Sequence, residues 1–304
     1  MADTKENGMN EQLLYIMLDV VTPVAVCAAV GVVWSKMKQP FDTQMVTRLV
    51  SNVGVPCLVF ATLVGVELDM NIFFDMALAA FLSTTTFLLL GWGILKLAGM
   101  PIRTNLNPIA FANTGNMGLP LCLLAFGEQG LALGIAYFVV NVILLVTVGI
   151  AVASAEFKPL DILRRPFIYA VIAAALFLTN DVEVPKVMLN TTKLLGNITI
   201  PLMLITLGVS LATLQINNIR RSIVIVTSRF GLGIPVGFGL AAILGFDGAA
   251  YGTLVVMCSM PVAVITFLFA ENYGADGRAV ASSVVLSTLI SFIMLPGLIW
   301  FLSY

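Results

Sequence analysis

Long apolar stretches separated by short polar connections recur along the whole chain. A helix needs roughly 20 apolar residues to cross a hydrocarbon core of about 30 Å. By this criterion the hydrophobic pattern predicts an all-α polytopic membrane protein with ten transmembrane helices and no room for a soluble domain. The predicted spans are residues 13–35, 44–65, 73–98, 104–125, 130–153, 166–180, 192–213, 220–245, 248–270 and 277–302.

Two segments about half a chain apart carry the same pattern. RLVSNVGVP ends at Pro56 and KLLGNITIP ends at Pro201, and every matched position in them is offset by 145 residues. A similar offset of 147 residues relates FGEQG at 126–130 to YGADG at 273–277. Repeats with helix breakers at matched points are typical of secondary transporters.

The ten spans divide into two repeats, residues 13–153 and 166–302, joined by the longest polar link of the chain. Each repeat has five spans. Because five is odd, the second repeat must enter the membrane from the opposite face, and inverted topology follows from parity.

The composition supports a membrane protein and argues against other classes. Apolar residues make up 60% of the chain and charged residues 10%, where about 25% charged is typical of soluble domains. A net charge of −1 gives no basic surface for nucleic acid. The chain lacks histidine, H-E-x-x-H and G-x-S-x-G, so we expect no enzyme, no metal and no cofactor. The cysteines lie in apolar runs without C-x-x-C spacing and are interpreted as small buried hydrophobes; they are Cys27, Cys57, Cys122 and Cys258.

The distribution of basic residues predicts the orientation. Connections after odd-numbered spans, with their flanking ends, hold eleven Lys and Arg residues, and the opposite face holds three, Lys5, Lys186 and Lys193. Cytoplasmic loops are enriched in Lys and Arg, so both termini are expected outside the cytoplasm. The acidic first eleven residues indicate no cleaved signal peptide. The eleven basic residues are Lys36, Lys38, Arg48, Lys96, Arg103, Lys158, Arg164, Arg165, Arg220, Arg221 and Arg278.

The fourth and ninth predicted spans contain helix breakers. The stretch NTGNMGLP at 113–120 combines two glycines, two amides and a proline, which disfavour a continuous helix. Thr114 and Asn116 are suitable N-caps for a following half-helix. In the ninth span, Ser259 is a suitable cap and Pro261 fits the first turn of the next half-helix.

Two broken helices at matched positions are expected to meet near the bilayer centre. Their half-helix N-termini would present unpaired N–H groups and partial positive charge, which attract a carboxylate. Simple kinks and close helix packing also use proline and glycine in membranes, and that interpretation stays open for each break taken alone.

The chain resembles the auxin efflux carrier family, whose members include plant auxin carriers and bacterial malonate- and malate-type permeases. The resemblance covers nearly the whole chain and is most specific in the N-x-G-N-x-G-L-P-L block. It is carried by Asn141 and by FANTGNMGLPLCLLAFGEQGL, RLVSNVGVPCLVF, LLGNITIPLMLITLGVSL and SMPVAVITFLFAENYGADGRAVASSVVLSTLISFIMLPG.

This resemblance implies a ten-helix fold similar to that of bile-acid sodium symporters. Residues 13–65 and 166–213 would form a scaffold domain, and residues 73–153 and 220–302 a mobile domain in which helices 4 and 9 are broken and crossed. It also suggests a homodimer through the scaffold and, from the compact form, a bacterial inner (plasma) membrane protein. The implied substrate-binding residues are Asn113, Thr114, Gly115, Asn116, Pro120, Asn141, Ser259 and Pro261.

Three charged residues lie within or beside the apolar spans. Arg229 is nine residues past Arg220, and an intramembrane arginine costs a few kcal/mol on insertion scales. It is expected to form an ion pair, with Glu271 as one candidate partner, or to attract an anion. Asp19 and Glu271 are candidate proton carriers if protons drive transport, although Asp19 also fits a hydrated interface position.

We therefore expect a secondary active transporter of a small organic anion, a dicarboxylate or an auxin-like aromatic acid, working by alternating access. A sodium- or proton-coupled symporter or a cation exchanger is the alternative, since broken helices also supply carbonyl ends for Na⁺. A channel is a weaker alternative because inverted repeats with midplane breaks favour a transporter.

Overall fold

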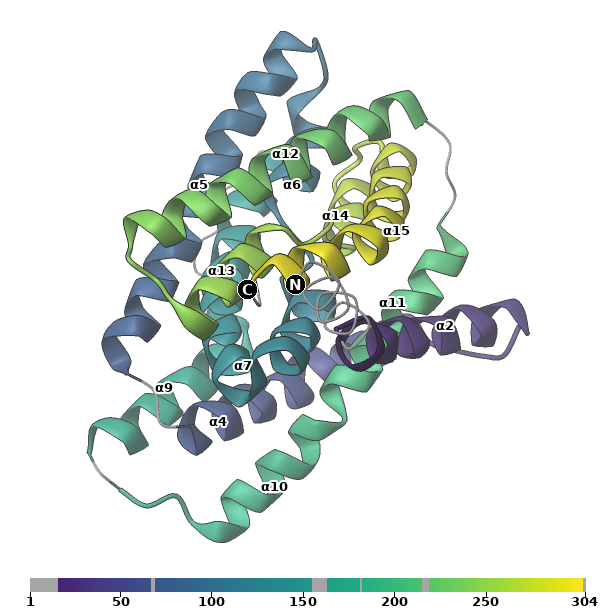
Figure 1. Cartoon of the computed structure of the whole chain (residues 1–304). Helices are drawn as coiled ribbons and strands as arrows, with labels where there is room; N and C mark the ends of the chain where they lie inside the picture. The colour runs from purple at the N-terminus through teal and green to yellow at the C-terminus, as the bar shows by residue number, and fades with distance from the viewer. Residues whose placement is uncertain (1–15, 67–68, 155–162, 181, 215–218, 303–304) are drawn as a thin grey trace, which may run out of the picture.

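The computed structural model describes residues 16–66, 69–154, 163–180, 182–214 and 219–302, and these residues form helices without a strand element (Figure 1). The elements, with η marking a π-helical turn, are η1 (Ile16–Val21), α2 (Thr22–Lys36), α3 (Thr43–Leu49), η2 (Val50–Gly54), α4 (Val55–Gly65), α5 (Met70–Leu97), α6 (Ile102–Ala110), η3 (Thr114–Gly118), α7 (Leu119–Leu144), η4 (Leu145–Gly149), α8 (Ile150–Ser154), α9 (Pro166–Thr179), α10 (Lys186–Asn197), α11 (Thr199–Thr213), α12 (Ile219–Ile243), α13 (Gly248–Cys258), α14 (Ile265–Asn272) and α15 (Gly277–Leu302).

Seven helical runs in the described residues are long and apolar enough to cross a membrane. Two further apolar helices, α9 and α13, are shorter. The expected fourth and fifth spans share one of the seven runs, Thr114–Ser154, whose 41 residues exceed a single crossing. The backbone leaves the helical region at Gly127, with φ 65° and ψ −160°, which places a kink in that run at the connection predicted between the two spans.

Three of the π-helical turns end two residues before a proline, at Pro23, Pro56 and Pro120. Proline has no N–H to donate, and its ring clashes with the carbonyl of the residue four positions earlier. A locally widened turn accommodates both defects without ending the helix. The repeat-related Pro201 lies three residues after Ile198, a turn residue between α10 and α11 whose backbone stays in the helical region, with φ −75° and ψ −18°.

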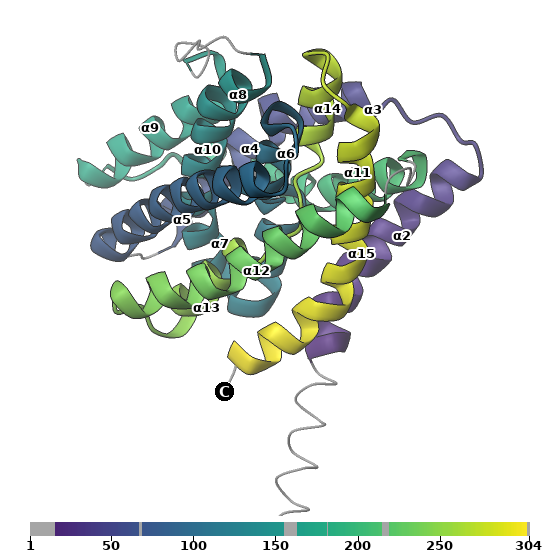
Figure 2. The same cartoon turned by 90° about the horizontal axis from the view of Figure 1, so that it is seen from above.

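The helices pack in two groups. In the first, α2 packs along α11, and α4 packs against α9 and α10. In the second, α12 packs against α5, α6, α13 and α15, and α7 packs against α5 and α13. In Figure 1, α9, α10 and α2 lie in the lower part of the molecule, and α5, α6, α12 and α15 in the upper part. Figure 2 shows α2 beginning at the same end of the molecule as the C-terminus.

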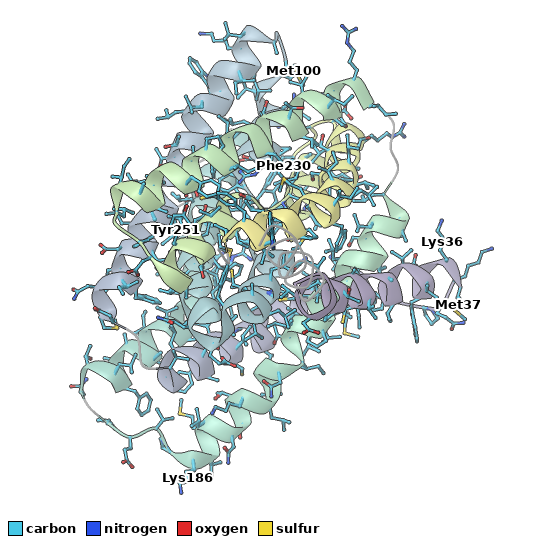
Figure 3. The ribbon with its side chains drawn as sticks, viewed as in Figure 1. Lys36, Met37, Met100, Lys186, Phe230 and Tyr251 are labelled. Atoms are coloured by element: carbon cyan, nitrogen blue, oxygen red, sulfur yellow. The ribbon has the colours of Figure 1, made fainter. Side chains whose placement is uncertain are left out.

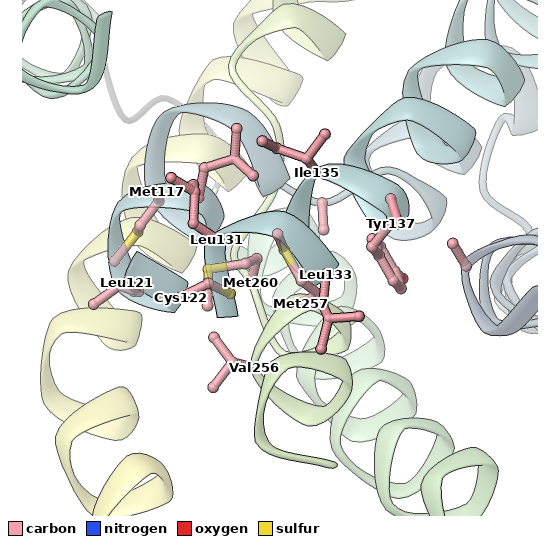
Figure 4. Close-up of a cluster of buried hydrophobic side chains, with 14 of the residues drawn as sticks. Met117, Leu121, Cys122, Leu131, Leu133, Ile135, Tyr137, Val256, Met257 and Met260 are labelled. Atoms are coloured by element: carbon pink, nitrogen blue, oxygen red, sulfur yellow. The ribbon is translucent and has the colours of Figure 1, made fainter. Parts of the chain in front are cut away.

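An apolar core lies where α7 and α13 meet (Figure 4). Met117 and Cys122 of the first half of the chain pack in this cluster with Met257 and Met260 of the second. Gly118 allows the contact, since a Cβ there would come within 2.7 Å of the Met257 sulfur. Cys122 and Cys258 are buried and free, as the sequence predicted, whereas Cys27 and Cys57 are free and only half-buried.

Several expectations fall partly outside the described residues. These are the start of the first span at residue 13, the basic residues Lys5 and Lys158, and most of the link between the two repeats. Among the described basic residues, Lys36 lies at the end of α2 and Lys186 at the start of α10 (Figure 3).

Candidate functional site

Two helices are interrupted in the described structure. The helix that ends at Ala110 resumes at Thr114, and the helix that ends at Cys258 resumes at Ile265. Both interruptions fall in the fourth and ninth predicted spans. The breaks expected from glycine, proline and amide residues are therefore present, although the first begins earlier than the sequence suggested, because the stretch 114–120 is itself helical.

The interruptions pair with each other through an isolated antiparallel bridge. The Asn113 N–H donates to the carbonyl of Pro261 at 2.8 Å, and the Ala263 N–H donates to the carbonyl of Phe111 at 3.1 Å. Extended backbone cannot satisfy its own polar groups, and hydrocarbon offers no water to replace them. Each interruption thus supplies hydrogen-bond partners for the other.

In the described residues, the helix that starts at Thr114 leaves two N–H groups without a backbone acceptor. The carbonyl of Asn113 accepts from Met117 at 3.3 Å, and the Thr114 N–H donates to Ala112. Within the described residues the N–H groups of Gly115 and Asn116 have no backbone acceptor, as expected for the first turn of a helix.

The predicted capping roles are wrong. No side chain caps this helix: Asn113 occupies the N-cap position, and neither Thr114 nor Asn116 bonds back to the first turn. In the second repeat, Ser259 and Pro261 lie inside the interruption and Val264 is the N-cap of α14.

Polar side chains next to the first interruption form a short buried chain. The Thr114 hydroxyl donates to Asn141 Oδ1 at 3.4 Å, and Asn141 Nδ2 donates to the Thr84 hydroxyl at 3.2 Å. Asn113 is 5% exposed, and its Nδ2 has no partner in the described part of the chain. Because an unpaired buried donor costs about 1–3 kcal/mol, this amide favours a ligand that accepts a hydrogen bond.

A cavity of about 390 Å³ borders both interruptions and lies between the two packing groups. Its walls come from α3, η2, α9 and α11 on one side and from η3, α7 and α14 on the other. The lining contains no acidic side chain among the described residues, and Arg165 is its one charged member. The polar lining residues are Thr43, Thr47, Ser51, Asn52, Asn113, Thr114, Asn116, Asn141, Arg165, Thr206, Ser210 and Thr213.

The cavity brings together five of the eight predicted binding residues: Asn113, Thr114, Gly115, Asn116 and Asn141. The other three do not line it. Pro120 is buried in the first turn of α7. Ser259 and Pro261 are buried, the Pro261 carbonyl takes part in the pairing with Asn113, and the Ser259 hydroxyl has no partner in the described residues. From the second repeat, Ala263, Val264 and Ile265 reach the cavity instead.

Arg229 is fully buried and lies outside the cavity lining. Its guanidinium donates to backbone carbonyls, including Ile109 at 2.8 Å and Met260 at 3.2 Å, and it stacks over Phe87 at 4.4 Å from the ring centroid. The expected ion pair with Glu271 is not formed in the described structure. Glu271 and Asp19 are both exposed and do not line the cavity.

Comparisons with known proteins decide the class. The model of the membrane transport protein family matches residues 16–158 and 150–299. The chain belongs to this family. The match confirms the resemblance to auxin efflux carriers inferred from the sequence, and it identifies an integral membrane transporter of a small molecule.

Three proteins with sequences similar to this chain are named as transporters. An uncharacterized transporter of Methanocaldococcus jannaschii is 26% identical over 224 residues, which cover 70% of this chain and 73% of the relative. Another, of Methanothermobacter thermautotrophicus, is 24% identical over 282 residues, covering 84% and 87%. A protein of Rhizobium meliloti named "Putative malonate transporter" is 30% identical over 208 residues, covering 63% and 64%.

Several residues that line the cavity of this transporter were not predicted from the sequence as binding residues. The sequence indicates Arg165 only as a marker of orientation, and it indicates for Asn52, one turn before Pro56, a structural hydrogen bond to freed carbonyls rather than a binding role. Thr206, whose buried hydroxyl has no partner in the described residues, lies in an apolar run with no distinguishing motif. The repeat offset could have identified Asn52, whereas Thr206 and Arg165 required the three-dimensional packing of α11 and α9.

Proposed function

We propose that the protein is a secondary active transporter that moves a small organic anion, a carboxylate, by alternating access. The observation that carries this proposal is a cavity bordered by both interruptions, with free N–H donors and no acidic lining residue among the described ones. The side-chain amides of Asn113 and Asn116 and the backbone N–H groups of Gly115 and Asn116 provide donors for a carboxylate, and helix N-termini add partial positive charge.

Two further observations support a carboxylate. Arg165 is exposed and lines the cavity, so its positive charge can attract an anion to the site. One relative is named for malonate, a small dicarboxylate. A cavity of about 390 Å³ lies within the range typical of small-molecule sites. We infer a substrate of dicarboxylate size, with aromatic carboxylates as the second class to test.

The proposed topology has ten crossings in two inverted repeats. The kink at Gly127 supports counting the run Thr114–Ser154 as two crossings, and the paired interruptions support crossed fourth and ninth helices near the bilayer centre. Both termini would then lie outside the cytoplasm of a bacterial inner membrane.

Movement between two domains would supply alternating access. The first packing group, within 13–65 and 166–213, corresponds to the proposed scaffold, and the second, within 73–153 and 220–302, to the mobile domain. The cavity between them has the exposed residues Thr47, Arg165 and Thr213 beside connections that carry the basic charge excess. This placement supports an inward-open state. A homodimer through the scaffold remains part of the proposal.

Uptake into proteoliposomes tests the site. We expect Asn113→Ala and Asn116→Ala each to lower uptake of labelled malonate or an aromatic carboxylate about tenfold, because a hydrogen bond to a charged group contributes about 1.5–3 kcal/mol. Asn190→Ala, at an exposed position of α10 outside the cavity, is the matched control and should transport normally. Unchanged uptake by both cavity variants, in folded protein, would remove the site assignment. Imposed proton and sodium gradients in the same vesicles identify the coupling ion.

A further inference from the structure

Arg229 joins the carbonyl ends of both interrupted helices. On the first repeat, its Nη1 donates to Ile109 at 2.8 Å and Ala110 at 3.4 Å, where α6 ends. On the second repeat, Nη2 donates to Cys258, the last residue of α13, and Nε donates to Met260 at 3.2 Å. One side chain therefore bonds the C-terminal ends of two helices that belong to different halves of the chain.

A helix C-terminus within a membrane requires a positive partner. Its last carbonyls have no intrahelical donor and carry about half a negative charge between them. Hydrocarbon provides no water for these groups, and transporters with broken helices bind coupling cations at such ends. Two C-termini brought together here would repel each other unless a cation lay between them.

The surroundings of Arg229 suit a permanent cation. The side chain has no exposed surface, and the Phe87 ring covers one face of the guanidinium. Gly233, one turn later on α12, lets the helix approach closely, since a Cβ there would overlap the Cys258 carbonyl oxygen. No acidic side chain of the described residues pairs with Arg229, so its positive charge is balanced by the helix ends.

We propose that Arg229 is a built-in cation for the two interrupted helices and takes the place of a bound metal cation at their carbonyl ends. The transporter then needs no sodium ion at this position to keep the interruptions paired. Arginine stays protonated, so this charge remains in place through the transport cycle. The inference concerns the pairing of the helices and holds for any substrate in the cavity.

The test measures thermal unfolding of the purified protein in detergent without substrate. The wild type should remain folded in choline chloride without sodium or potassium, and all variants are compared in that salt at constant ionic strength. Arg229→Gln keeps hydrogen-bond donors but loses the charge, and we expect its Tm to fall by about 5 °C or more. Arg229→Lys retains the charge and should lose less. Arg229→Ala should be stabilised saturably by millimolar guanidinium, because a ligand bound only to the folded state raises stability by mass action.

Arg220→Ala is the matched control, an exposed arginine on the same helix, and guanidinium should not stabilise it. An Arg229→Gln variant as stable as the wild type in choline chloride would overturn the proposal. If Arg229→Ala does not accumulate, the comparison of Gln with Lys still decides whether the charge is needed. These readouts use no substrate, so their failure is distinct from failure of the proposed anion transport.

Discussion

At the scale of single residues, two arginines near the interruptions, Arg229 and Arg165, differ in exposure and therefore in role. Arg229 is fully buried, and its positive charge offsets the partial negative charge at the C-terminal ends of α6 and α13. Arg165 is exposed at the N-cap position of α9, and water can reach it. Screening limits an exposed charge pair to about 0.2–1 kcal/mol. Arg165 should therefore influence how strongly an anion is attracted, while the buried amides determine how it is held.

We expect Arg165→Gln to raise the KM for malonate about two- to fivefold without a large change in kcat. A monocarboxylate should show a smaller change because it carries one negative charge fewer. Uptake kinetics at low and high salt measure the effect, which should shrink at high salt. Arg164→Gln, next in sequence and outside the cavity, is the control. Equal changes in the two variants would contradict a role specific to Arg165.

At the scale of helices, α2 and α11 are in backbone contact. A Cβ at Gly208 would overlap the carbonyl oxygen of Ala28, and one at Gly31 would overlap that of Ile205. We expect Gly208→Ala to destabilise the protein by about 1–3 kcal/mol, since the two helices must separate. Gly239→Ala on α12, where a Cβ meets nothing within 4 Å, should be neutral or stabilise by up to about 1 kcal/mol. Thermal unfolding compares the two, and equal Tm values would refute the close contact.

The interrupted helices also show what sequence reasoning can and cannot predict. Glycine, proline and amide residues identified both breaks because their effects on a helix are local. The extent of each break was less predictable: the stretch 114–120 stays helical because a π-helical turn accommodates Pro120. The contacts of Arg229 could not be predicted from the sequence, since its partners are backbone carbonyls at the ends of two other helices. Every residue type carries such a carbonyl, so no sequence pattern identifies these partners. Thr206 could not be predicted as a cavity residue for a similar reason, because its position in the lining depends on which face of α11 is turned toward the cavity.

At the scale of the whole molecule, the proposed orientation can be tested with two lysines. Lys36 at the end of α2 and Lys186 at the start of α10 are both exposed, and the charge pattern assigns them to opposite faces. In a background without native cysteines, Lys36→Cys should react with a membrane-impermeant thiol reagent only from the cytoplasmic side. Lys186→Cys should react only from outside. Labelling of intact cells and of inverted vesicles distinguishes the two.

This experiment also tests the inverted repeat. Lys36 follows the first predicted crossing and Lys186 the sixth, so five crossings separate them and an odd number must place them on opposite faces. Labelling of both positions from the same side would require an even number between them. That result would contradict both the ten-crossing topology and the inversion, because two copies separated by an even number of crossings enter the membrane from the same face. The inverted arrangement would then be removed from the proposal, whereas the paired interruptions would still border the cavity.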